Sequence, residues 1–394
     1  MNDENLIAAA DAFGTPLYVF DEASLRDRVA LLEETLPARA ALCFAVKANP
    51  LAIPLISPYV HRFEVCSPGE LRICQNVGVD PAEIVLSGVA KDEDLIRGLL
   101  DAGAAVHRYT VESRRQFDLL LALAREYGRP LPLLLRLTCG SQFGMDEADI
   151  RAIIAEHGTD PAVDIWGIQQ FSGTQKTSLR RVQRELAKAD ELMAALAADY
   201  GFTVREFEYG PGLPADYFSE EDPAATREHL EGLGSLLDAM AFDGPLTLEI
   251  GRGLTAWCGT YLTRVVDAKT NQGVNYAIVD GGIHHITYYG GGLGLKAWPC
   301  RQLAAPEGAP VEEWTLCGSL CTTNDILMKA MTVAGLEVGT LFAFDKAGAY
   351  CMTEGVSLLL SRDLPAVAFA DGDGNLTLVR GPVRTDPLNT PSMP

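Results

Sequence analysis

Residues 41–50 read Ala-Leu-Cys-Phe-Ala-Val-Lys-Ala-Asn-Pro, a short apolar run that ends on a lysine. Seven similar runs follow before residue 251, and segments with helical patterning separate them. The eight strand-like runs are Ala41–Val46, Arg62–Cys66, Ile84–Gly88, His107–Val111, Pro132–Leu137, Ile165–Phe171, Arg205–Gly210 and Leu246–Ile250. The helical segments include Glu70–Val77, Asp92–Ala102, Glu112–Tyr127, Glu147–His157 and Leu179–Tyr200.

This alternation of strand and helix predicts parallel strands joined by crossover helices. Eight repeats are the number that closes a (β/α)8 barrel. An open doubly wound sheet is the alternative α/β fold, but no GxGxxG motif follows the first strand-like run. The pattern therefore favours a barrel, which we expect to span residues 25–255.

The sequence after residue 255 is typical of a mainly β domain. Strands are expected at Tyr261–Asp267, Asn275–Asp280, Trp314–Leu316, Thr340–Asp345 and Leu376–Val379, with turn signals such as Asn271-Gln272-Gly273 between them. Pro16–Phe20 also resembles a strand and could pair into this domain. We therefore expect a second domain formed by residues 1–24 and 256–394, with residues 385–394 as a frayed tail.

Composition excludes several classes of protein. The 394 residues include 32 Lys and Arg against 53 Asp and Glu, a net charge of −21, which argues against a nucleic-acid or anionic-membrane surface. No apolar run approaches the ~20 residues of a membrane span, and the acidic start is unlike a secretory leader. The nine cysteines are scattered without a CxxC pair, so a zinc ribbon is not expected. We expect the cysteines to be reduced thiols in a cytoplasmic protein.

In a parallel barrel, chemistry collects at the carboxyl ends of the strands. Those ends carry Lys47, Arg136, the turn Gly210–Leu213, Glu249 and Arg252. Alone, a lysine at a strand end more often reaches solvent, and a glycine-rich turn is more often only a turn. Together they match the needs of pyridoxal phosphate: an amine that bonds to its aldehyde, donors for its phosphate and a carboxylate at its ring nitrogen.

The sequence resembles the fold-type III pyridoxal-phosphate decarboxylases, the group of diaminopimelate, ornithine and arginine decarboxylases. Seven segments carry the resemblance, in the family's order along nearly the whole chain. They are Phe44–Asn49 (the cofactor lysine), Glu64–Leu71 (SxGEL), Gly210–Leu213 (the phosphate glycines, with Pro211 replacing one), Glu249–Arg252 (EPGR), Asp280–Gly282 (DGG), Leu320–Asp325 (the cysteine loop) and Ala347–Tyr350 (AGAY).

The resemblance implies an alanine-racemase-like barrel with a β domain, and a homodimer with two shared active sites. It implies that Lys47 holds the cofactor, that Glu249 faces the ring nitrogen, and that Cys321 from the partner subunit protonates the substrate. The implied cofactor-binding residues are Lys47, Phe171, Ser172, Gly173, Gly210, Gly212, Glu249, Arg252 and Tyr350, and the implied substrate-binding residues are Arg136, Thr322 and Asp325. No metal is expected, because adjacent histidines on a strand, as we interpret His284 and His285, point to opposite faces.

Three departures bear on the substrate. Phe171 occupies the position of a histidine that stacks on the cofactor in the family. Thr322 replaces the acidic residue that follows the loop cysteine in diamine-specific members. The loop Cys139–Asp146 is short, and in these features the chain most resembles decarboxylases of carrier-tethered glutamate and of siderophore pathways. An amino-acid racemase on the same fold, which would need arginine at position 249, and a non-catalytic cofactor-binding homologue are the alternatives.

Overall fold

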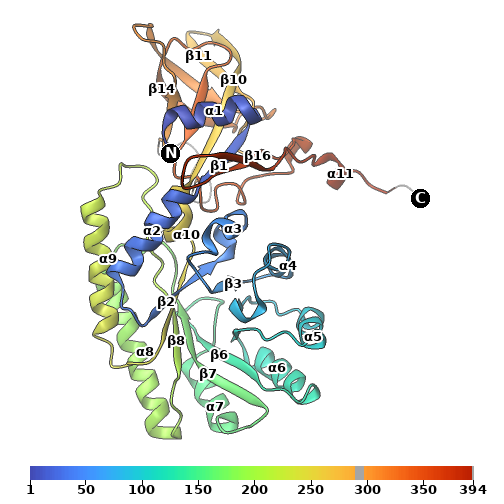
Figure 1. The fold of residues 1–394 in the computed structure, drawn as a ribbon, viewed down its shortest axis with the longest axis vertical. Helices are drawn as coiled ribbons and strands as arrows, with labels where there is room; N and C mark the ends of the chain where they lie inside the picture. The colour runs from blue at the N-terminus through green and yellow to red at the C-terminus, as the bar shows by residue number, and fades with distance from the viewer. Residues whose placement is uncertain (289–296, 393–394) are drawn as a thin grey trace. The chain divides into compact units, whose positions relative to one another are not determined.

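The computed structural model describes residues 1–288 and 297–392. The chain divides into two compact units. The barrel unit comprises Arg28–Ala215 and Asp222–Leu254, and the β unit comprises Met1–Asp27, Asp216–Glu221 and Thr255–Pro394. Figure 1 follows the elements of each unit along the chain.

Eight parallel strands close into a barrel, which confirms the predicted fold. They follow one another in chain order, and the last strand pairs with the first. Each predicted run supplies one strand, with ends that differ by two residues or fewer. The strands are β2 (Ala40–Ala45), β3 (Phe63–Val65), β4 (Ile84–Leu86), β5 (Arg108–Val111), β6 (Leu131–Leu137), β7 (Val163–Phe171), β8 (Glu206–Gly210) and β9 (Leu246–Ile250).

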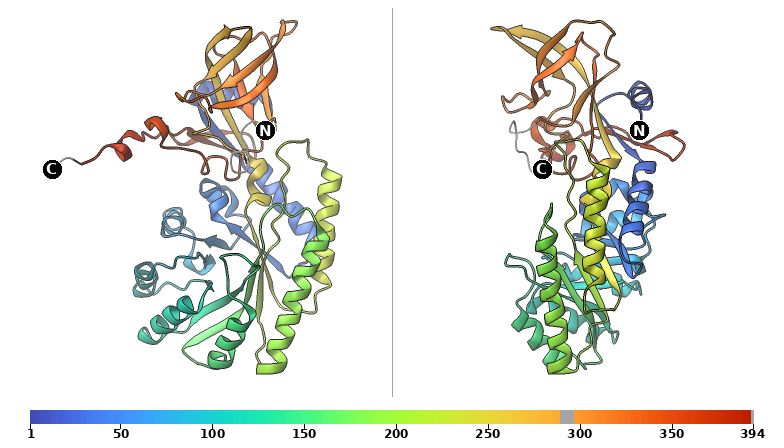
Figure 2. Two further views of the ribbon diagram at one scale, coloured as in Figure 1. Left: turned by 180° about the vertical axis from the view of Figure 1, so that it is seen from behind. Right: turned by 90° about the vertical axis from the view of Figure 1, so that its left-hand side faces the viewer.

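The helices between successive barrel strands lie on the outside of the barrel (Figures 1 and 2), while α2 precedes the first barrel strand and α10 follows the last. They are α2 (Glu22–Thr35), α3 (Ile53–Ile56), α4 (Pro68–Asn76), α5 (Glu93–Asp101), α6 (Arg114–Glu126), α7 (Glu147–His157), α8 (Leu179–Tyr200), α9 (Pro223–Asp238) and α10 (Arg252–Thr255). The helices expected at Glu147–His157 and Leu179–Tyr200 are found with those bounds.

Capping side chains start the helices that follow two of the strands. The backbone N–H of Glu70 donates to Ser67 Oγ, and Glu70 Oε2 in turn accepts from the backbone N–H of Cys66. Ser113 caps α6 in the same manner, by accepting from the backbone N–H of Gln116. Such reciprocal capping satisfies N–H groups that a helix start leaves unpaired. It therefore fixes where each strand turns into its helix.

The β unit is a mainly β structure, as predicted. Its main sheet has the strand order β14-β13-β11-β10-β1-β16-β17, with β12 and β15 attached beside this path. The strands are β1 (Leu17–Asp21), β10 (Gly259–Asn271), β11 (Val274–Val279), β12 (Cys300–Leu303), β13 (Val311–Cys317), β14 (Ile326–Ala334), β15 (Leu341–Phe344), β16 (Ala366–Ala370) and β17 (Leu376–Arg380), with helices α1 (Asp3–Phe13) and α11 (Asp386–Asn389). β1 pairs with β10 and β16, which confirms that the strand near residues 16–20 joins this sheet.

The expectation of a frayed tail from residue 385 was wrong as far as residue 389. Thr385 is buried and donates from Oγ1 to the carbonyl of Arg362. Asn389, at the end of α11, donates to the carbonyl of Leu358. These side-chain bonds to distant backbone groups anchor the segment. Among the described residues, no helix combines the length and apolar character of a membrane span.

Candidate active site

Lys47 lies at the carboxyl end of the first barrel strand, in the 3-10 turn Val46–Ala48. Its Nζ atom donates to Glu64 Oε2 at 2.7 Å and to Glu249 Oε1 at 3.0 Å. Both glutamates are buried, whereas 34% of the Lys47 side chain is exposed. The lysine is therefore held in the barrel mouth by two carboxylates, with part of its surface open to a ligand.

Strand register explains how Glu249 reaches this position. β9 pairs with β2 so that Glu249 lies opposite Cys43, close to the end of the strand that leads to Lys47. Gln169, on β7, donates from Nε2 to Glu249 Oε2 at 3.2 Å. The Oε1 atom of Gln169 is buried and has no hydrogen-bond partner within the described part of the chain. A buried acceptor without a partner is costly, so a ligand that donates here would be stabilised.

The two carboxylates beside Lys47 differ in proton affinity. Burial acts to raise the pKa of Glu64, but the charge of Lys47 and a hydrogen bond from Cys66 Sγ outweigh burial and lower that pKa. Burial raises the pKa of Glu249, and the charge of Glu64 raises it further. Glu64 therefore carries the charge that balances Lys47, and Glu249 is the member that binds a proton more readily.

Glu208 is a third buried carboxyl group in the barrel, and the sequence analysis missed it. It is fully buried, and neither of its oxygens has a partner among the residues described. Burial raises the pKa of Glu208 well above its ordinary value of 4.5, and the charges of Glu249 and Glu206 raise it further. Folding therefore favours the protonated, neutral form of Glu208. Its only signal in the sequence is a second glutamate in the run Arg205–Gly210, two residues after Glu206.

Arg136 lies at the end of β6, where it forms a buried ion pair with Glu112 at 2.8 Å. Its guanidinium also lies 4.9 Å from the ring centroid of Phe143. Glu112 Oε2 accepts from the backbone N–H of Gly144, so the pair also fixes the loop between β6 and α7. Arg136 Nε is buried without a partner in the described residues, which leaves one donor for a ligand. Its substrate-binding role stays a prediction.

Two glycine turns meet at the carboxyl ends of β7 and β8. A Cβ atom on Gly212, which has φ +61°, would lie 2.2 Å from the carbonyl oxygen of Gly173. A Cβ atom on Gly210 would lie 2.3 Å from Cδ2 of Phe171. Only glycine permits these approaches. The predicted phosphate-binding residues Ser172, Gly173, Gly210 and Gly212 are thus brought together, with Phe171 packed beside them.

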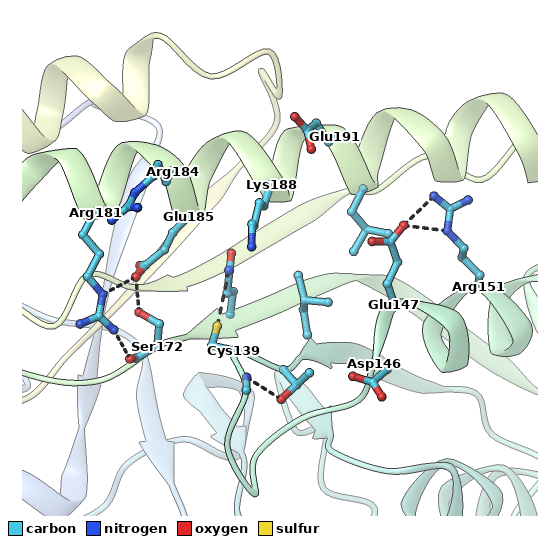
Figure 3. A pocket seen from close by; sticks show the side chains of 15 residues that line it. Cys139, Asp146, Glu147, Arg151, Ser172, Arg181, Arg184, Glu185, Lys188 and Glu191 are labelled. Carbon is cyan, nitrogen blue, oxygen red and sulfur yellow. Dashed lines mark hydrogen bonds and ion pairs between the residues drawn. The ribbon is translucent and has the colours of Figure 1, made fainter.

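A groove of about 980 Å³ lies on the outer side of β6 and β7, between α7 and α8 (Figure 3). Ser172 donates from Oγ to Glu185 Oε1 at 2.5 Å at one end of it. Arg181 joins the pair, donating to Glu185 at 3.0 Å and to the carbonyl of Ser172 at 2.8 Å. Burial acts to raise the pKa of Glu185, but hydrogen bonds from Lys176 and Ser172 outweigh it and lower that pKa. Glu185 and Lys176 were not predicted as site residues.

The remaining predicted residues belong to the β unit. Cys321 is exposed and Thr322 follows it. Asp325 is buried, and its two oxygens accept from the backbone N–H groups of Ile283 and Leu320, both at 2.8 Å. In this structure Asp325 therefore orders the loop that carries Cys321, and its contact with substrate stays a prediction. Tyr350 is half-buried with φ +65°.

His284 and His285 were expected to point to opposite faces of a strand, and that expectation was wrong. They lie in a turn after β11, and their ring centroids are 3.7 Å apart. Two glycines precede them: a Cβ atom on Gly281 would lie 1.8 Å from the Tyr261 hydroxyl oxygen, and one on Gly282 would lie 2.6 Å from Asp325 Oδ2. Burial lowers the pKa of His284 to about 3 and that of His285 to about 4, so both stay neutral. Within the described ranges, no group of three or more His, Cys, Asp or Glu side chains could hold a metal ion.

The residues at the barrel mouth fit pyridoxal phosphate. The covalent chemistry requires a primary amine, and Lys47 supplies it between two carboxylates. The phosphate requires close approach of backbone donors, which the glycine turns permit. Gln169 Oε1 and Arg136 Nε are buried polar atoms without partners in the described residues, and both can receive ligand groups.

The chain is similar to known proteins over most of its length. Residues 22–256 match the family model "Pyridoxal-dependent decarboxylase, pyridoxal binding domain". Diaminopimelate decarboxylase from Pseudomonas aeruginosa is 30% identical over 368 residues, which cover 86% of this chain and 84% of that protein. The crystal structure of AQ1208 from Aquifex aeolicus matches with a TM-score of 0.85 and 25% identity, covering 97% and 93% of the two chains. Diaminopimelate decarboxylase from Helicobacter pylori complexed with L-lysine matches with a TM-score of 0.84 and 21% identity, covering 98% of each chain.

Proposed function

The chain belongs to the pyridoxal-dependent decarboxylases and takes pyridoxal 5′-phosphate as its cofactor, and from that premise we propose that it releases the α-carboxylate of an L-amino acid or amino-acid moiety as CO2. The observation that carries this proposal is the position of Lys47 Nζ, within 3.0 Å of both Glu64 and Glu249. A glutamate at position 249 also argues for decarboxylation over racemisation. A carboxylate there favours a protonated, strongly electron-withdrawing ring, whereas a racemase of this fold would need arginine.

The chemistry divides between the cofactor and the protein. When bound, the cofactor supplies the electron sink that accepts the electron pair left behind as CO2 departs. Lys47 would hold the cofactor through Nζ, and the substrate amine would take its place. Glu249, kept in place by Gln169, governs the proton at the ring nitrogen. Cys321 of the partner subunit, with Tyr350 or water, delivers a proton to the α-carbon, which replaces the lost carboxylate.

The binding roles follow the positions of the side chains. Glycine turns and hydroxyl groups bind the phosphate, and the ring of Phe171 stacks on the cofactor without donating a proton. On the substrate side, we propose that Arg136, Thr322 and Asp325 contact the substrate. The phosphate-binding set is Ser172, Gly173, Gly210, Gly212, Arg252 and Tyr350. The nine cysteines are free thiols, which supports our proposal of a reducing, cytoplasmic compartment.

We propose that the active form is a homodimer with two shared sites, and mixing two inactive variants tests it. Lys47→Ala and Cys321→Ala subunits should each be nearly inactive alone. After unfolding and refolding of an equal mixture, half of the dimers contain one intact site, so about a quarter of wild-type CO2 release should return. Cys139 is the other exposed cysteine among the nine, so the Cys139→Ala variant should stay active and serves as the control. If the mixture stays inactive although co-purification of differently tagged subunits shows mixed dimers, the shared-site proposal is wrong.

For the substrate, we propose an amino-acid moiety without a distal ammonium group, presented on a carrier rather than free. Thr322 supports this, because a hydroxyl offers no charge to bind a distal ammonium. The short loop Cys139–Asp146 supports it as well, since its hydrogen bonds to the Arg136–Glu112 pair fix it close to the barrel. Free diaminopimelate is the second candidate, because the relatives that match the chain carry that name.

A screen of CO2 release separates these substrates. Purified protein loaded with cofactor is given diaminopimelate, ornithine, lysine and glutamate, and then glutamate as a thioester on a carrier protein. Release of CO2 only from the tethered substrate supports the carrier proposal, and release from free diaminopimelate refutes it. A product that has lost its stereochemistry but kept its carboxylate would identify a racemase. Bound cofactor with no reaction of any substrate would favour a non-catalytic protein.

A further inference from the structure

Lys176 is a buried lysine that neither the strand-end pattern nor the family motifs single out. It lies in the loop between β7 and α8, and its side chain has no exposed surface. An ammonium group is stable in such a place only where it is paired and hydrogen-bonded. The hydrogen-bond partners of Lys176 therefore indicate its role.

Four oxygen atoms surround the Lys176 Nζ atom. It lies 2.8 Å from Glu185 Oε2, 3.0 Å from Ser172 Oγ, 3.1 Å from the carbonyl of Gly210 and 3.3 Å from the Tyr209 hydroxyl. These atoms come from three elements: the loop after β7, helix α8, and the end of β8. One ammonium group thus connects both of the turns that carry the predicted phosphate ligands.

The backbone of Lys176 makes the same connection. Its N–H donates to the carbonyl of Gly212 at 2.9 Å. A Cβ atom on Gly212 would lie 2.8 Å from Lys176 Cε and 2.2 Å from the carbonyl oxygen of Gly173. The lysine stem therefore packs against the glycine turn itself, and the two turns are held together from behind.

The charge of this cluster also suits an anion. Lys176 and Arg181 both bond to Glu185, so two positive groups face one carboxylate. The hydroxyl of Ser172 donates to Glu185 and accepts from Lys176, which fixes its direction. The Lys176 ammonium group lies within 3.1 Å of Ser172 Oγ and of the Gly210 carbonyl, so its charge is close to the proposed phosphate-binding turns.

We propose that Lys176 is a positioning residue for the cofactor phosphate: it keeps the Ser172–Gly173 turn and the Gly210–Gly212 turn in register and supplies positive charge behind them. This inference rests on the phosphate-binding assignment made under the proposed function. It does not depend on the substrate, because it concerns only how the protein recognises its cofactor.

Binding of two forms of the cofactor tests the proposal. In Lys176→Met, the affinity for pyridoxal 5′-phosphate should fall by about tenfold or more, while the affinity for pyridoxal, which lacks the phosphate, should change less than about twofold. Both dissociation constants are measured by fluorescence titration of the apoprotein. Lys188→Met is the matched control, since Lys188 is exposed on α8 and has no hydrogen bond or ion pair among the described residues. It should bind both compounds as the wild type does.

Two outcomes would overturn the proposal. Equal weakening for both compounds would mean a general structural role, and unchanged affinity for the phosphate form would mean no role. Circular dichroism checks that Lys176→Met is folded, and Arg181 remains to pair with Glu185 in that variant. Should it fail to fold, Lys176→Met with Glu185→Gln removes both charges and permits the same titrations. Because binding is read without CO2 release, a wrong substrate proposal would leave this test intact.

Discussion

Lys47→Ala should abolish CO2 release and the visible absorbance of the protein loaded with cofactor. The Nζ atom of Lys47 is the only amine that the structure holds between Glu64 and Glu249 in the described barrel. Alanine offers no nitrogen to bond to the aldehyde, so the rate should fall roughly 10³-fold or more. The measurements are a CO2-release assay and an absorbance spectrum of the purified, cofactor-loaded variant.

Lys47→Arg separates the covalent role of the lysine from its charge. A guanidinium keeps a cation between the two carboxylates, so the melting temperature should stay near that of the wild type, but it cannot form the bond. In Lys47→Ala the two carboxylates lose their common partner, and the protein should melt at a lower temperature at pH 8. Lys188→Ala should change neither property. If Lys47→Ala kept more than about a tenth of wild-type activity, the whole assignment of the site would be wrong.

The barrel could be predicted because its signal is local. Strands that are buried on both faces form continuous apolar runs, and several runs are followed by a helix with a capping serine, such as Ser67 or Ser113. Residues that end those runs, such as Lys47 and Glu249, necessarily gather at one end of a closed barrel. The fold and the centre of the site therefore followed from patterns that occupy a few consecutive residues.

Other parts of the site depend on contacts between distant residues, which no local pattern reveals. The ammonium group of Lys176 contacts the Tyr209 hydroxyl and the Gly210 carbonyl, which lie more than thirty residues later in the chain. The motif predicts a substrate contact for Asp325 but does not reveal that its oxygens also accept from the backbone groups of Ile283 and Leu320. His284 and His285 were misplaced because a strand pattern was extended through a pair of glycines.

Glu208→Gln should stabilise the protein at high pH and leave it unchanged at low pH. The pKa of Glu208 is raised in the folded protein, so the folded state binds this proton more tightly than the unfolded chain. Below pH 4.5 both states are protonated and the difference vanishes. As the pH rises above 4.5 the unfolded chain releases the proton first, and the free energy of unfolding falls by at most about 1.4 kcal/mol per pH unit. Glutamine resembles the neutral acid in shape and has no proton to lose, so it removes this penalty.

Glu206→Gln, two residues earlier on the same strand, should have the opposite effect. Burial acts to raise its pKa, but the charge of Arg108, 2.6 Å away, and a hydrogen bond from the Thr247 hydroxyl help to lower it to about 2. A lowered pKa gives stability that is present above pH 4.5 and lost as the pH falls toward 2, and glutamine forfeits it. Urea unfolding at pH 5 and pH 8 should therefore show Glu208→Gln gaining about 1–3 kcal/mol at pH 8 and Glu206→Gln losing a similar amount. If the Glu208→Gln variant were instead less stable than the wild type at pH 8, Glu208 would be ionised in the folded protein. The barrel interior would then hold a carboxylate that has no ion-pair partner among the described residues.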